Sequence, residues 1–123
     1  MKLATVIILM IFISGCAVSG TPETLAWAKA ATNDHNENLL FSCWSESYKK
    51  LETCDGLSCM WGVLTFAEQC GKNAGPSQKA CSMVPSSPFS YVQWVKGTCV
   101  DVGHPTEACM KTLGKVAQVC NSA

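Results

Sequence analysis

Residues 43–70 read CWSESYKKLETCDGLSCMWGVLTFAEQC, and the four cysteines in this stretch predict how it folds. Cys43 and Cys54 are eleven residues apart, and so are Cys59 and Cys70. Eleven residues make about three helical turns, so the cysteines of each pair lie along one face if the segment between them is helical. Apolar residues recur at steps of three and four, and lysine and glutamate take the opposite face of the first segment. This pattern predicts two helices joined by a short turn.

Helical geometry restricts which of these cysteines can bond. In a helix the Cα atoms of Cys43 and Cys54 would be about 16 Å apart, whereas a disulfide requires a separation below about 7 Å. Bonds within either helix are therefore excluded. Two helices joined by the turn at residues 55–58 run antiparallel, which brings Cys54 next to Cys59 and Cys43 next to Cys70. We expect these two bonds to staple the hairpin at both ends.

The remaining cysteines follow the same rule. Cys109 and Cys120 are again eleven residues apart, which excludes a bond between them if the segment is helical. We expect Cys99 to pair with Cys109 across the intervening loop and Cys81 to reach Cys120. A bond from Cys81 across to the first hairpin is the alternative that the sequence leaves open.

Other helix signals complete an all-helical pattern. Thr21 followed by Pro22 is typical of a helix start, with a capping hydroxyl and proline at the first helical position. The turn at 55–58 is expected to supply an N-cap, and Gly71 is expected to end the helix that contains Cys59. Further helices are expected over 77–84, over 89–100 and from 104 to 120, although the Val, Tyr and Trp content of 89–100 also suits a strand.

These elements predict an all-α fold: a small disulfide-stapled helical bundle of about five short helices, arranged as two nested helical hairpins. The nested pairs resemble the twin-cysteine helical hairpins of mitochondrial import substrates, whose repeats are tighter by one residue and which lack secretory leaders. That resemblance implies a hairpin and no function. The residues do not assign the chain to a family.

Residues 1–20 have the features of a secretory signal peptide. Lys2 supplies the positive start, residues 3–13 form the apolar run, and small residues follow it. Cleavage is expected before Thr21, and Gly15 with Ala17 offers a second site. The run is about half as long as the roughly twenty residues that span a bilayer, so no stable membrane anchor is expected.

Cys16 bears on the count of cysteines. Residues 13–16 are similar to a bacterial lipobox, in which this cysteine would be lipidated. We favour its removal with the leader, because an even number of cysteines then remains in residues 21–123 and all of them can pair. A single cysteine-rich helical domain, secreted to the extracellular space where disulfides persist, is therefore expected.

Charge and motif content exclude several function classes. The chain has no arginine, and its formal net charge is zero. This composition argues against nucleic acid as a partner. Residues 34–38 begin like a calcium loop, but Leu39 stands where glycine is needed and Ser45 where a bidentate glutamate is needed. Neither His35 nor His104 has a serine or reactive cysteine nucleophile nearby in sequence. We expect no enzyme activity, no cofactor and no metal.

The helix after the turn carries apolar residues outside its core face. Trp61 lies off the face that Cys59 and Val63 share, and Met60 is adjacent to it. Burial of this helix on both sides is the favoured interpretation; the alternative is that it borders a ligand pocket or a partner surface. Under that alternative, Trp61, Met60 and Trp94 are the candidate contact residues.

The general behaviour of small, disulfide-rich secreted proteins suggests a function. Small, rigid, disulfide-rich secreted scaffolds present a preorganised surface. We therefore expect a non-enzymatic protein that binds an extracellular protein, as an effector, a toxin-like protein or a signalling ligand. An extracellular carrier of a small hydrophobic ligand is the alternative. A closed apolar cavity would favour the carrier, and a filled core with an exposed aromatic patch would favour the protein ligand.

Overall fold

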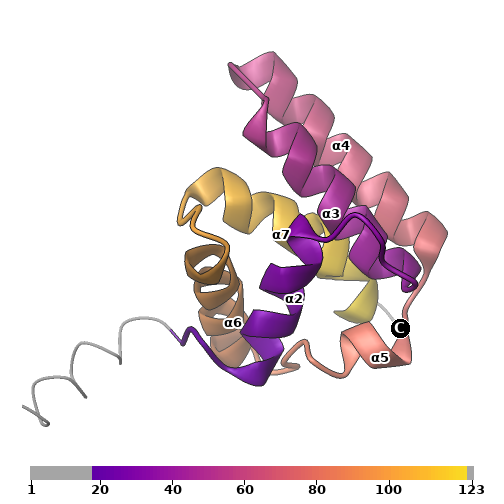
Figure 1. Cartoon of the computed structure of the whole chain (residues 1–123), viewed down its shortest axis with the longest axis vertical. Helices are drawn as coiled ribbons and strands as arrows, with labels where there is room; N and C mark the ends of the chain where they lie inside the picture. The colour runs from indigo at the N-terminus through magenta and orange to yellow at the C-terminus, as the bar shows by residue number, and fades with distance from the viewer. Residues whose placement is uncertain (1–17, 122–123) are drawn as a thin grey trace, which may run out of the picture.

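The structure, a computed structural model, describes residues 18–121, and all regular structure in this range is helical (Figure 1). The expected all-α, disulfide-stapled bundle is confirmed. Residues 1–17, most of the expected leader, lie outside the described residues. The helices are α2 (Pro22–Thr32), α3 (Leu39–Glu52), α4 (Leu57–Ala74), α5 (Gln78–Cys81), α6 (Pro88–Asp101) and α7 (Glu107–Asn121).

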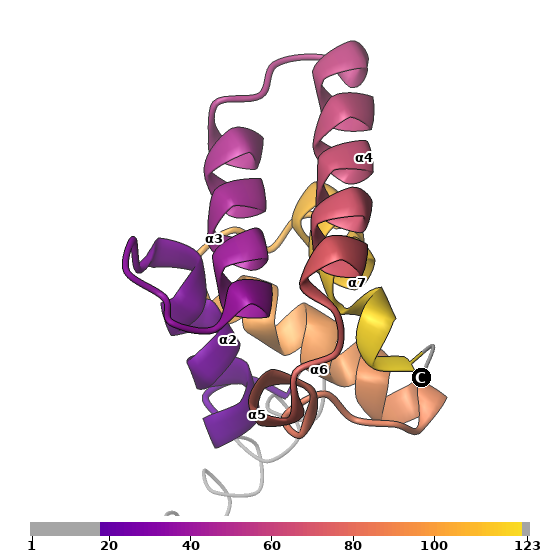
Figure 2. The same cartoon turned by 90° about the vertical axis from the view of Figure 1, so that its right-hand side faces the viewer.

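Helices α3 and α4 form the expected antiparallel hairpin. In Figure 2 they lie side by side, and the turn that joins them projects away from the other helices. The side chain of Asn38 caps α3 by accepting hydrogen bonds from the backbone N–H groups of Leu40 and Phe41. Helix α4 instead begins after Gly56, at a φ of 92°, and has no side-chain cap. The turn thus supplies the N-cap residue as expected, but this residue is a glycine, which allows the positive φ and has no side chain to cap the helix.

Gly71 does not end α4, which contradicts the sequence-based prediction. The helix continues to Ala74, and Gly75 terminates it at a φ of 75°. At Gly71 a Cβ atom would lie 2.9 Å from the carbonyl oxygen of Val116 in α7. Glycine is thus needed here for close approach between two helices rather than for a helix end.

The chain over 88–101 forms α6 and not a strand. The hydroxyl of Ser87 accepts a hydrogen bond from the N–H of Ser90, and Pro88 occupies the start of the helix. The buried residues Trp94, Val95, Thr98 and Cys99 then recur at helical steps. Capping and periodicity together outweigh the strand propensity of this segment.

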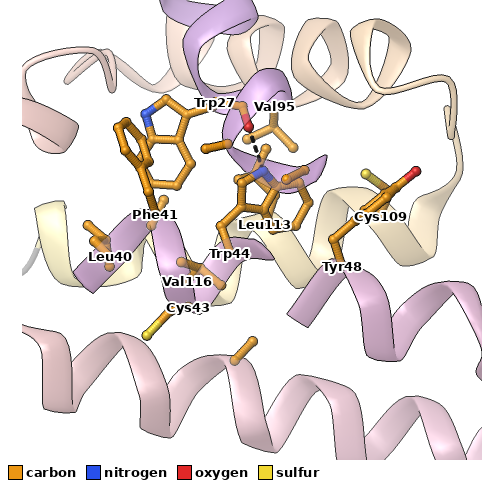
Figure 3. Packing of buried hydrophobic residues seen from close by; sticks show 14 of the residues in the cluster. Trp27, Leu40, Phe41, Cys43, Trp44, Tyr48, Val95, Cys109, Leu113 and Val116 are labelled. Atoms are coloured by element: carbon orange, nitrogen blue, oxygen red, sulfur yellow. Dashed lines mark hydrogen bonds between the residues drawn. The ribbon is translucent and has the colours of Figure 1, made fainter. Parts of the chain in front are cut away.

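Tryptophan side chains tie the helices together at the core (Figure 3). Trp27 and Trp44 are fully buried. The indole N–H of Trp44 donates to the carbonyl of Trp27 at 2.8 Å, and that of Trp27 donates to the carbonyl of Ala80 at 3.3 Å. Trp27 also packs edge-on against Phe41 and Trp94, with ring centroids 5.0 and 5.3 Å apart. Each indole therefore has its polar group satisfied while filling the core.

Four disulfides join the helices, and they connect the same cysteines as the pairing expected from helical spacing. The Cα separations are 5.6 Å for Cys43–Cys70, 5.5 Å for Cys54–Cys59, 5.3 Å for Cys81–Cys120 and 6.1 Å for Cys99–Cys109. Cys81 lies in α5, so its bond joins α5 to α7 and does not complete a second hairpin with α6. The two halves of the domain are consequently stapled in different ways.

Candidate functional site

The first candidate site is the end of the α3–α4 hairpin. Leu57 and Trp61 stand four residues apart in the first turns of α4, so they share one face of the helix. Their exposed fractions are 80% and 70%. We call this pair the hairpin tip. Val63 and Ala67, on another face of α4, are 3% and 0% exposed and pack into the core.

The exposure of Trp61 corrects the favoured interpretation of the sequence. Burial of α4 on both sides is wrong, because α3 and α7 cover one part of its surface and leave the tip uncovered. Periodicity identified the second apolar face but could not show whether another element covers it. Leu57 was missed as a surface residue because the sequence placed it in the turn.

The other two candidate contact residues lie elsewhere. Met60 is partly buried and packs against the core cluster. Trp94 belongs to α6, is 2% exposed, and donates its indole N–H to the carbonyl of Glu23 at 3.4 Å. The structure therefore does not bring Trp61, Met60 and Trp94 together on one surface.

The hairpin that carries the tip is held rigidly. The Cys54–Cys59 bond closes it next to Leu57, and the Cys43–Cys70 bond closes it at the other end. Between them, the ammonium group of Lys50 in α3 lies 4.7 Å from the centre of the Phe66 ring in α4. A cation over an aromatic face adds a modest attraction between the two helices.

An ion pair fixes α4 against α7. The carboxylate of Glu68 accepts a hydrogen bond from the ammonium group of Lys115 at 3.1 Å, and Lys72 lies 3.5 Å away on the same helix. The hydrogen bond from Lys115 and the positive charges of both lysines lower the pKa of the Glu68 carboxyl from its usual 4.5. Because these side chains are all partly exposed to solvent, the ion pair contributes only modestly to stability.

The second candidate site is a pocket between α2 and α6, of about 410 Å³, which opens to solvent. We call it the α2–α6 pocket. Its lining residues are Val18, Thr21, Glu23, Thr24, Ser82, Met83, Pro85, Phe89, Ser90, Gln93 and Trp94. The amide oxygen of Gln93 is buried, and it has no hydrogen-bond partner among the described residues. Sequence reasoning singled out Trp94 but not the pocket, whose walls come from segments far apart in the chain.

The two histidines lie apart from both sites. His35 is exposed in the loop before α3. The ring of His104 packs against that of Tyr48 with centroids 6.0 Å apart. Across residues 18–121, no cluster of His, Cys, Asp and Glu is placed to hold a metal ion.

Comparison of the chain with protein-family models, with curated proteins and with solved structures gives no match. Among the described helices, none combines the length and the apolar character needed to cross a membrane.

Proposed function

We propose that the protein is a secreted, non-enzymatic binding protein that contacts an extracellular protein through the hairpin tip. The observation that carries this proposal is Trp61, 70% exposed at the end of a hairpin closed by two disulfides. The protein would act as an effector, a toxin-like protein or a signalling ligand.

The energetics of binding favour such a surface. Tryptophan is enriched among the few interface residues that contribute most to affinity, because its large ring removes much apolar area from water. Burying a large apolar side chain such as Leu57 contributes roughly 1.5–3 kcal/mol. The disulfides hold the backbone of the hairpin in place before binding, so little backbone entropy is lost on association.

The filled core supports this function over the carrier. Trp27, Trp44 and Leu113 are fully buried and occupy the centre of the bundle. The α2–α6 pocket, about 410 Å³, lies at the surface and opens to solvent. It is therefore not the closed apolar cavity that a carrier with a buried ligand would have.

Binding to cells tests the proposal. The secreted protein, labelled with a fluorophore at its C-terminus, is titrated onto cells from the producing organism and from other species. We expect saturable binding on at least one cell type, abolished when a protease first strips the cell surface. The Leu57→Ser, Trp61→Ser variant should bind at least tenfold more weakly, since two apolar contacts are lost.

A matched control separates the tip from general surface hydrophobicity. Leu25 is 50% exposed on α2, outside the hairpin, so Leu25→Ser removes a similar side chain and should leave binding unchanged. Unchanged binding by the tip variant, or no saturable binding on any cell type, would refute the proposed function. Circular dichroism of each variant verifies that the helices are intact.

A further inference from the structure

We propose that the α2–α6 pocket binds a small, neutral, largely apolar molecule that carries a single hydroxyl group. This site is separate from the hairpin tip and does not depend on the function proposed for the tip. The inference rests on the apolar walls of the pocket, on the unpaired amide of Gln93 and on the charges around it.

The walls of the pocket are mainly apolar. Met83 and Pro85 contribute from the segment after α5, and Phe89 and Trp94 contribute from α6. The indole N–H of Trp94 is already engaged with the carbonyl of Glu23, so its ring presents an apolar surface. A volume of about 410 Å³ falls within the range of pockets that hold small molecules.

Gln93 is the polar group that lacks a partner. Its amide oxygen is buried, and no described residue donates to it. Leaving a buried acceptor without a hydrogen bond is unfavourable, so a ligand that donates to it binds more tightly. The Gln93 amide offers one acceptor and two donors, and rotation about its last torsion exchanges them. A hydroxyl group, which both donates and accepts, matches this amide in either orientation.

Thr21 and Thr24, two other polar residues of the pocket, do not compete for the ligand. The hydroxyls of Thr21 and Thr24 lie 3.1 Å apart and form the capping box of α2. Each is also engaged with the backbone of the other residue. Gln93 therefore supplies the buried polar atom of this pocket that lacks a partner, and a single hydroxyl group on the ligand would satisfy it.

Charge excludes acidic ligands. The charged residue among those that line the pocket is Glu23, and no lysine or histidine is among them. A carboxylate bound here would lie near another negative charge, with no cation to offset the loss of its water. We therefore expect a neutral alcohol to bind more tightly than the fatty acid of the same chain length.

Titration calorimetry on the secreted protein tests this site. The probes are 1-nonanol, its methyl ether and nonanoic acid, which have similar apolar chains but differ in the polar end. We expect saturable binding of the alcohol, with the ether weaker by about 2- to 12-fold because it cannot donate a hydrogen bond. Nonanoic acid should bind most weakly of the three at neutral pH.

Variants connect the binding to the pocket. Gln93→Met retains the length of the side chain but removes the amide, so the alcohol and the ether should then bind equally. Ser90→Trp, which places a large ring at the exposed edge of the pocket, should abolish binding of both, and Trp61→Ala on the hairpin tip should leave both unchanged. No saturable binding of the alcohol, tighter binding of the acid, or a retained preference for the alcohol in Gln93→Met would each overturn the proposal.

Discussion

Removal of individual disulfides should destabilise the domain more when the loop that the bond closes is longer. We compare Cys43→Ala, Cys70→Ala with Cys54→Ala, Cys59→Ala. The first bond spans 27 residues in sequence and the second spans 5. In the chain-entropy description a crosslink restricts the unfolded chain more when its loop is longer.

The magnitudes follow from those loop lengths. At 25 °C the entropy relation gives about 3.5 kcal/mol for the Cys43–Cys70 bond and about 2 kcal/mol for the Cys54–Cys59 bond. Cys43 is also 4% exposed, so replacing its sulfur by hydrogen leaves a small void that adds to the first value. Cys59 is exposed, and its replacement leaves no void. For a domain of this size, about 1 kcal/mol corresponds to a change of roughly 4–8 °C in melting temperature.

Urea unfolding followed by circular dichroism measures both variants against the parent protein. We expect the midpoint to fall further for the variant that lacks the Cys43–Cys70 bond. An equal or larger loss for the variant that lacks the Cys54–Cys59 bond would refute the argument. So would an undetectable loss in both, since the crosslinks would then contribute nothing to folding.

Other predictions concern packing, acid stability and processing. Gly71→Ala should destabilise the domain by about 1–3 kcal/mol in urea, because the new methyl group overlaps a carbonyl of α7. Gly114→Ala is the control, with its nearest atom at an ordinary 3.6 Å, and should not destabilise; equal losses would contradict the packing argument. In the folded protein the pKa of the Glu68 carboxyl is lower than its usual 4.5, so the ionised carboxylate stabilises the fold above pH 4.5. This stabilisation is lost as the pH falls through the pKa of the folded state. As the pH is lowered, the free energy of unfolding of Glu68→Gln should therefore fall less than that of the parent protein. Parallel plots of unfolding free energy against pH would contradict this. Intact mass should place the mature N-terminus at Thr21, the cleavage site expected from the leader; a chain that begins three residues earlier, at Val18, would contradict this expectation and would retain the hydrogen bond from the N–H of Gly20 to the carboxylate of Asp101 at 2.9 Å.

The sequence predicted the disulfide-stapled helices because cysteine spacing and apolar spacing constrain the same elements. A pair eleven residues apart cannot bond within a helix, so Cys43 and Cys54 had to find partners on a neighbouring helix. The sequence could not predict the role of Gly71, because glycine favours both helix ends and close helix contacts. Only the position of α7 distinguishes the two.

The candidate sites were less accessible to sequence reasoning. The apolar pattern marked Trp61 as lying off the core face, but its exposure depends on which helices cover α4. The α2–α6 pocket could not be predicted, because its walls come from residues more than sixty positions apart in the chain, such as Val18 and Phe89. An amide such as that of Gln93 carries no periodic signal, so its burial without a partner emerges only from tertiary packing.

The central claim is that four specific disulfides hold the bundle and orient the hairpin tip, and peptide mapping without reduction tests it most directly. After tryptic digestion, residues 30–49 should be linked to 51–72, residues 80–96 should be linked to 116–123, and residues 97–111 should contain an internal bond. Cyanogen bromide then cleaves after Met60 and separates Cys59 from Cys70. We expect the fragment with Cys43 to be linked to residues 61–72. A bond from Cys43 to Cys54 would contradict both the pairing and the helix between them, because a helix cannot bring those two sulfur atoms together.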